Sequence, residues 1–223
     1  MRTLATHEVV QLVHPRPITE RDELGIAVGH AIDSALSRYS HESAQGFRPT
    51  ASSMNRLAAE DLEEQLSDAH VAVSPEEKGS VQRQIAGVLQ AFRQSEVFGL
   101  RRPRTRMIVI DEAVGIYAQP DYWDGKSRFY EMKSYRAFPP HPDVALQLKL
   151  FQLAFPGFNA YLLSIDRHAT PVTTLLSPIP PLTAEESSEV LRSAFRWGLE
   201  RGIEKVLDYV DSPIVRYSTS AGR

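Results

Sequence analysis

The chain has 223 residues, of which 42% are hydrophobic and 24% charged, an ordinary composition for one globular domain. It contains no cysteine, which excludes disulfides, thiolate zinc sites, cysteine nucleophiles and cysteine-bound iron–sulfur clusters. The net charge of −3 does not indicate a polyanion-binding surface overall, and no apolar run approaches the roughly 20 residues of a membrane span. We therefore expect a cytoplasmic protein that does not bind membranes.

The first 100 residues are expected to be mainly helical. Apolar residues at helical spacing predict one helix over residues 20–40 and a second over 46–69. A third helix is predicted over 74–99, with Ser74 as its N-cap and Gly99 at its end.

The next segment changes in composition. Residues 106–136 are rich in β-branched and aromatic side chains and predict two or three strands joined by turns. A helix over 141–155, two strands over 158–166 and 170–179, and a last helix capped by Thr183 complete the pattern. We expect one α/β domain with a helical part (1–100), a sheet core (101–180), a C-terminal helix (181–212) and a loose tail (213–223).

Three charged residues flank a predicted hairpin turn. Residues two apart on a strand share a face, so Glu131 and Lys133 point the same way. Asp121 lies on the preceding strand, and a two-residue loop would direct it away from Glu131. A three-residue loop over 123–125, with its glycine in the left-handed conformation, or another odd loop, places all three on one face. We predict an odd loop.

Two carboxylates on one sheet face repel each other unless a cation lies between them. Mg²⁺ prefers such oxygen ligands and keeps several waters, one of which it can activate. A nearby lysine can orient that water or neutralise a phosphate. The alternative is an ordinary surface hairpin whose Glu131 and Lys133 form a solvated pair.

This stretch resembles the PD-(D/E)XK nuclease superfamily. Pro120 and Asp121 correspond to the PD element, and Glu131, Met132 and Lys133 to the ExK element. The resemblance implies a restriction-endonuclease-like core, in which a mixed central sheet is flanked by helices. It also implies that Asp121, Glu131 and the Met132 carbonyl bind Mg²⁺ or Mn²⁺, and that Lys133 supports the attacking water.

Two further elements are similar to the RecB-like branch of that superfamily. Gln147 is followed four residues later by Phe151, where the branch has a Q-x-x-x-Y element. The resemblance implies that Gln147 lies beside the metal and orients the substrate or the catalytic lysine, although Phe151 lacks the tyrosine hydroxyl. His30, with Asp33 after it, resembles an early helical metal ligand, but the spacing differs from the usual one. The alternatives are a polar helix position for Gln147 and a core histidine for His30.

Basic residues near the hairpin predict a local surface for nucleic acid, because each phosphate contact adds affinity that depends on salt. For any single residue, a solvated charge is the alternative. The candidates are Arg101, Arg102, Arg104, Lys126, Arg136 and Lys149.

The function expected from this resemblance is Mg²⁺- or Mn²⁺-dependent hydrolysis of DNA by an exonuclease or end-processing enzyme of repair or recombination, without an iron–sulfur cluster. The main alternative is a non-catalytic nucleic-acid-binding or assembly module that retains the nuclease fold. A small-molecule hydrolase that uses the same carboxylate pair is a third reading. The choice between DNA and RNA and the presence of a homo-oligomer are left open.

Overall fold

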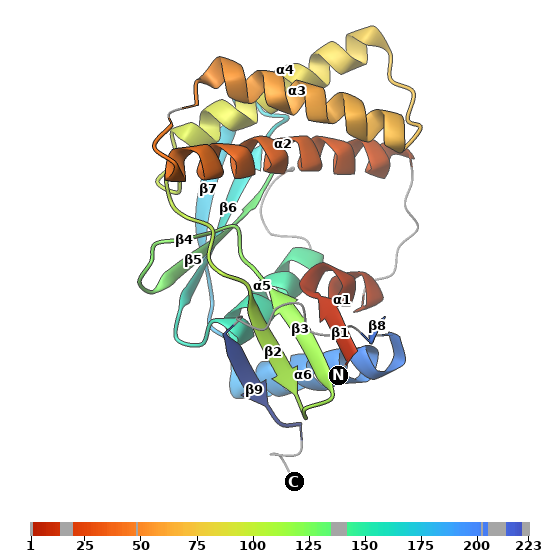
Figure 1. The fold of residues 1–223 in the computed structure, drawn as a ribbon, viewed down its shortest axis with the longest axis vertical. Coiled ribbons are helices and arrows are strands. Elements are labelled where there is room, and N and C mark those ends of the chain that lie inside the picture. The colour runs from red at the N-terminus through yellow and green to blue at the C-terminus, as the bar shows by residue number, and fades with distance from the viewer. Residues whose placement is uncertain are drawn as a thin grey trace.

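The computed structural model of the chain describes residues 2–13, 20–47, 49–134, 142–201, 203–204 and 213–219 (Figure 1). The helices are α1 (Thr6–Val13), α2 (Glu20–Ala44), α3 (Ala51–Asp68), α4 (Pro75–Arg93), α5 (Pro142–Ala154) and α6 (Ala184–Arg201). The strands are β1 (Arg2–Ala5), β2 (Arg106–Ile110), β3 (Val114–Ala118), β4 (Tyr122–Trp123), β5 (Arg128–Lys133), β6 (Asn159–Asp166), β7 (Thr173–Ile179), β8 (Ile203–Glu204) and β9 (Ile214–Tyr217). The predicted α/β class, with mixed sheets flanked by helices, is confirmed.

Helices α2, α3 and α4 lie together at one end of the molecule (Figure 1). The predicted cap of α4 is present, because the Ser74 hydroxyl accepts a hydrogen bond of 3.2 Å from the Glu77 amide. This helix ends at Arg93, six residues before Gly99. The Ser95 hydroxyl donates to the Phe92 carbonyl at 2.7 Å and turns the chain out of the helix.

The described strands form two hydrogen-bonded sheets where the sequence predicted one. The first has the order β8-β1-β3-β2-β9 and the second the order β4-β5-β6-β7. The chain leaves the first sheet after β3 through Gln119 and Pro120, then enters the second at β4. Pro120 has no amide hydrogen and cannot donate a hydrogen bond to a neighbouring strand. The Gln119 side chain donates a hydrogen bond of 2.9 Å to the Pro103 carbonyl. The break in the sheet therefore falls at the proposed PD element.

The second sheet lies between two apolar cores. Tyr122, Tyr130 and Leu163 face the core built by α2, α3 and α4. Phe129 and Leu162 face the other core, which contains residues of α5, α6 and the first sheet. Successive side chains of β5 thus enter different cores, as the alternation of a strand requires. This sandwich holds β5, the strand of the proposed ExK element, from both sides.

Both ends of the chain differ from the sequence prediction. Residues 2–5 form β1, which pairs parallel to β3, and the following α1 was also not predicted. The expected loose tail contains β9, which pairs parallel to β2, so that prediction is wrong for residues 214–217. The Tyr217 hydroxyl anchors β9 by donating to the Leu153 carbonyl at 2.8 Å.

The predicted C-terminal helix is shorter than expected, because α6 ends at Arg201 and β8 follows at 203–204. Residues 205–212 of that prediction lie outside the described residues. Within the described part of the chain, no helix has both the length and the apolar character needed to cross a bilayer.

The packing of α6 on β3 leads to a stability prediction. A Cβ atom at Gly198 would collide with the Val114 side chain, which is fully buried. We expect Gly198→Ala to lower the melting temperature, because overpacking costs about 1–3 kcal/mol. That cost exceeds the roughly 1 kcal/mol by which alanine is favoured over glycine inside a helix.

Gly29→Ala in α2 is the matched control, since a Cβ atom there meets open space. It should raise the melting temperature, because only the helix-propensity gain remains. Thermal unfolding followed by circular dichroism compares the two variants. A Gly198→Ala variant as stable as wild type would contradict the described packing of α6 on β3.

Candidate active site

The register of the β4–β5 hairpin decides which side chains meet. Tyr122 pairs with Tyr130 and Trp123 with Phe129, so the same register sets Asp121 opposite Glu131. The Asp124 amide donates to the Arg128 carbonyl at 3.1 Å and closes a three-residue loop, 125–127. The prediction of an odd loop is confirmed.

The loop lies two residues later than the predicted 123–125, and the Asp124 side chain explains the shift. Its Oδ1 accepts hydrogen bonds from the amides of Lys126, Ser127 and Arg128 at 2.8, 2.9 and 3.0 Å. The turn therefore starts at Asp124, a common role for aspartate. Gly125 has a φ of 75°, so the left-handed position falls on the predicted glycine.

Asp121 lies directly before β4 and is held there by contacts to both of its carboxylate oxygens. Its Oδ2 accepts a hydrogen bond of 2.8 Å from the Met132 amide, and its Oδ1 lies 3.5 Å from Nη2 of Arg102. The Met132 side chain packs against the helical core. Asp121 is thus fixed to the backbone of β5 beside Glu131, the residue opposite it in the hairpin.

Glu131 is an ionisable residue inside the protein, with 2% of its surface exposed. Its Oε1 lies 2.5 Å from Nζ of Lys133. Its Oε2 is buried and has no hydrogen-bond partner among the described residues. Burial, followed by the charge of Asp121, raises the pKa of the Glu131 carboxyl to about 8. A buried carboxylate oxygen without a hydrogen-bond partner can bind a cation or a proton.

Helix α2 brings a second group of side chains to the hairpin. Asp33 Oδ1 lies 3.5 Å from the same Nη2 of Arg102 that contacts Asp121. Partial desolvation, followed by the charge of Asp121, raises the pKa of the Asp33 carboxyl, while Arg102, Lys133 and His30 act in the opposite direction. Asp121 therefore interacts electrostatically with Asp33 of α2 as well as with Glu131 of β5.

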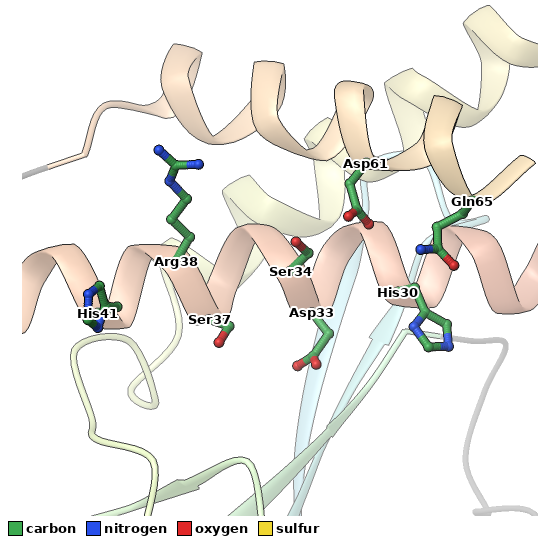
Figure 2. Close-up of a pocket in the computed structure, with 8 residues that line it drawn as sticks. All are labelled: His30, Asp33, Ser34, Ser37, Arg38, His41, Asp61 and Gln65. Carbon is green, nitrogen blue, oxygen red and sulfur yellow. The ribbon is translucent and has the colours of Figure 1, made fainter. Parts of the chain in front are cut away.

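His30 is exposed on α2, which disagrees with the alternative of a core histidine. Figure 2 shows His30 and Asp33 on one side of the helix, pointing away from α3. Both line a hollow of about 500 Å³ along α2 and α3. Asp61 and Gln65 of α3 also line it, and neither was predicted from the sequence as a site residue. Their four-residue spacing was the available signal, and any solvated helix face shares it.

The position of Gln147 follows from the crossover between β5 and β6. These strands are parallel, so α5, which joins them, runs back along the sheet. Phe151 of α5 contacts Phe129 of β5 with ring centroids 6.2 Å apart. Gln147 lies one turn earlier on the same side of α5, toward the end of β5 that carries Glu131 and Lys133. Its role beside the metal remains a prediction.

The predicted phosphate-binding residues differ in their exposure and in their contacts with carboxylates. Arg101, Arg104 and Lys126 are exposed, whereas Arg102 lies between two carboxylates. Lys149 forms an ion pair of 2.9 Å with Glu186 of α6. The Thr183 amide, followed by Lys149, lowers the pKa of the Glu186 carboxyl to about 2. In the described structure Lys149 is therefore engaged with Glu186, and Arg136 lies outside the described residues.

Within the part of the chain that is described, no group of three or more His, Asp or Glu side chains is arranged to hold a metal ion. The arrangement at the hairpin offers two carboxylates and the neighbouring backbone. Mg²⁺ commonly binds proteins through one or two carboxylates and keeps several waters. The unpartnered Oε2 of Glu131 fits such a cation.

The chain has no matching family model and no matching curated protein. Among solved structures, it is similar to a protein from Eubacterium rectale named "Putative exonuclease", with 9% identity over 82% of this chain and 85% of that one and a TM-score of 0.47. It is also similar to a protein named SSO0001, with 15% identity over 89% of this chain and 76% of that one and a TM-score of 0.40. At identities and scores this low, the function has to be argued from the site itself.

The raised pKa of Glu131 leads to a prediction for the metal-free protein. We expect the free energy of unfolding to fall as pH rises from about 4.5 to about 8. Over this range the unfolded chain has lost the Glu131 proton, while the folded chain still binds it. Below pH 4.5 both states are protonated, so the contribution of this group is then fully retained.

Glu131→Gln should remove this part of the pH dependence, and Mg²⁺ should stabilise wild type but not the variant at pH 8. Thermal unfolding in EDTA and in Mg²⁺, at pH 5 and at pH 8, measures both effects. Glu60→Gln, on the exposed surface of α3, is the control. Equal pH dependence of Glu131→Gln and wild type would refute the assignment of the buried proton.

Proposed function

We propose that this chain is a metal-dependent nuclease of the PD-(D/E)XK type that hydrolyses DNA phosphodiesters. The observation that supports it most is the hairpin register, which sets Asp121 opposite Glu131. The Lys133 ammonium lies 2.5 Å from the Glu131 carboxylate, so an acid pair and a lysine meet at the end of one strand. This combination suits hydrolysis of a phosphodiester by a bound cation.

The metal proposed for this site is Mg²⁺ or Mn²⁺. Asp121 and Glu131 would hold it, with the Met132 carbonyl as a further oxygen ligand and His30 from α2 assisting. When bound, such an ion lowers the pKa of a coordinated water and neutralises charge on the phosphate. The raised pKa of Glu131 and its unpartnered buried Oε2 support a cation at this place, since both describe a carboxylate without enough positive charge around it.

The chain's own groups supply the remaining functions. Lys133, whose ammonium is held by its contact with Glu131, would orient the attacking water or take its proton. Gln147, one turn from Phe151 on α5, would orient the substrate or Lys133. Exposed Arg101 and Arg104 would contact phosphates along the strand without reading its sequence. An exonuclease or end-processing reaction is proposed by analogy with the RecB-like branch.

A non-catalytic nucleic-acid-binding module is the second candidate, and one observation favours it. Both carboxylate oxygens of Asp121 already have partners, the Met132 amide and the Arg102 guanidinium. A site that kept this arrangement in the presence of Mg²⁺ would bind DNA without cutting it.

DNA cleavage tests the proposal. We expect wild type to degrade linear DNA in Mg²⁺ or Mn²⁺ and to leave it intact in EDTA. Lys133→Ala should cut at least about 100-fold more slowly, the usual effect of losing a group that handles the reacting proton. A covalently closed circle distinguishes the two modes of cutting, since an exonuclease leaves it intact.

Lys78→Ala is the matched control, because Lys78 of α4 pairs with Glu63 of α3 and is not a residue of the proposed site. It should cut at the wild-type rate. Equal rates for Lys133→Ala and wild type would remove the catalytic assignment. Salt-sensitive DNA binding without any cleavage would favour the non-catalytic module instead.

A further inference from the structure

Arg102 joins two parts of the chain that are distant in sequence. Its Nη2 lies 3.5 Å from Asp33 Oδ1 on α2 and 3.5 Å from Asp121 Oδ1 at the hairpin. From the sequence, Arg102 is one of several basic residues expected to contact phosphate. In the structure, its guanidinium lies between the carboxylate of Asp121, a proposed metal ligand, and that of Asp33 on α2.

The backbone beside Arg102 is fixed next to the hairpin. The Trp123 amide donates to the Arg101 carbonyl at 2.9 Å, and these two residues form an antiparallel bridge. Arg102 is therefore held within reach of Asp121 by main-chain hydrogen bonding. A guanidinium placed in this way can turn between nearby partners while its backbone stays in position.

Both contacts of Arg102 are easily exchanged. Each distance is at the long limit for a hydrogen bond, and the side chains of Arg102, Asp33 and Asp121 are 39%, 58% and 19% exposed. Ion pairs with this exposure are weak, because water screens the charges. A divalent cation at Asp121 would neutralise that carboxylate and repel the guanidinium.

We propose that Arg102 couples cation binding to nucleic-acid binding in this chain. Without a divalent cation, its guanidinium bridges Asp33 and Asp121. When a cation binds Asp121, the guanidinium turns to a phosphate of the substrate strand, which its planar fork of donors suits well. This inference rests on the proposed nuclease function and assigns Arg102 as a substrate-binding residue that contacts phosphate only in the metal-bound protein.

Coupling of this kind is reciprocal. If the cation strengthens DNA binding through Arg102, then DNA strengthens cation binding by the same factor. Removing the guanidinium should weaken both effects together, since one side chain links them. The coupling also adds one phosphate contact, so DNA affinity should fall more steeply with salt when the cation is present.

The experiment measures binding, not cleavage, with Ca²⁺ as the cation and a fluorescent DNA duplex with one free end as the probe. Fluorescence anisotropy gives the DNA affinity of wild type, Arg102→Gln, Arg104→Gln and Arg56→Gln in EDTA and in Ca²⁺ over a range of salt concentrations. Titration calorimetry gives the Ca²⁺ affinity with and without DNA. Arg56 lies on α3 paired with Glu60, and its substitution removes one positive charge outside the proposed site.

For wild type we expect Ca²⁺ to raise DNA affinity about fivefold or more and to steepen the salt slope by about 0.9, one phosphate contact. Arg102→Gln should bind DNA as wild type does in EDTA and lose the Ca²⁺-dependent gain. Arg104→Gln should weaken binding by the same factor in both conditions, and Arg56→Gln should match wild type. Asp33→Asn should shrink the effect of Ca²⁺, because Arg102 is then partly released without it.

Equal losses by Arg102→Gln in EDTA and in Ca²⁺ would overturn the coupling, since Arg102 would then be a constant phosphate contact. An unchanged response to Ca²⁺ would overturn it as well. In either case wild-type cleavage in Mg²⁺ would leave the proposed function standing. Absence of both DNA binding and cleavage by wild type would remove the proposed function, and the coupling with it.

Discussion

The proposed site depends on one constraint, the hydrogen bonding of the Asp124 carboxylate to three successive amides of the hairpin loop. These bonds start the turn at Asp124 and limit the loop to three residues. An odd loop keeps Asp121 on the same side of the sheet as Glu131, whereas an even one would reverse it. The chemistry available at the end of β5 is therefore decided several residues away, at a turn that touches neither carboxylate.

This arrangement makes ionisation of the Glu131 carboxyl unfavourable. A carboxylate between two apolar cores has lost its water, and the neighbouring Asp121 adds repulsion. Lys133 compensates one oxygen, and the other has no partner among the described residues. Stable folding does not require a charge at this position, because a well-packed apolar residue usually serves as well. A buried acid that lacks full compensation is more readily explained by a function than by packing.

The helical layer and the hairpin were predictable because local patterns produce them. Ser74 caps α4, and Gly125 takes the left-handed position of its turn, each for reasons contained within a few residues. The strands at the two ends were not predictable in this way. Residues 2–5 and 214–217 become strands by pairing with β3 and β2, which lie about 100 residues away. The local sequence pattern of a segment does not reveal which distant strand it pairs with.

By itself, the sequence determined the types of the main elements, the candidate acid pair and lysine, and the odd loop length that brings these three residues together. The tertiary structure decided that the strands divide into two sheets at Pro120, that β5 lies between two cores, and that α2 brings Asp33 to the hairpin. It also decided the position of Arg102 between two carboxylates. The physical reason is that capping, turns and strand alternation act within a few residues, whereas burial and charge pairing depend on which distant segments pack together.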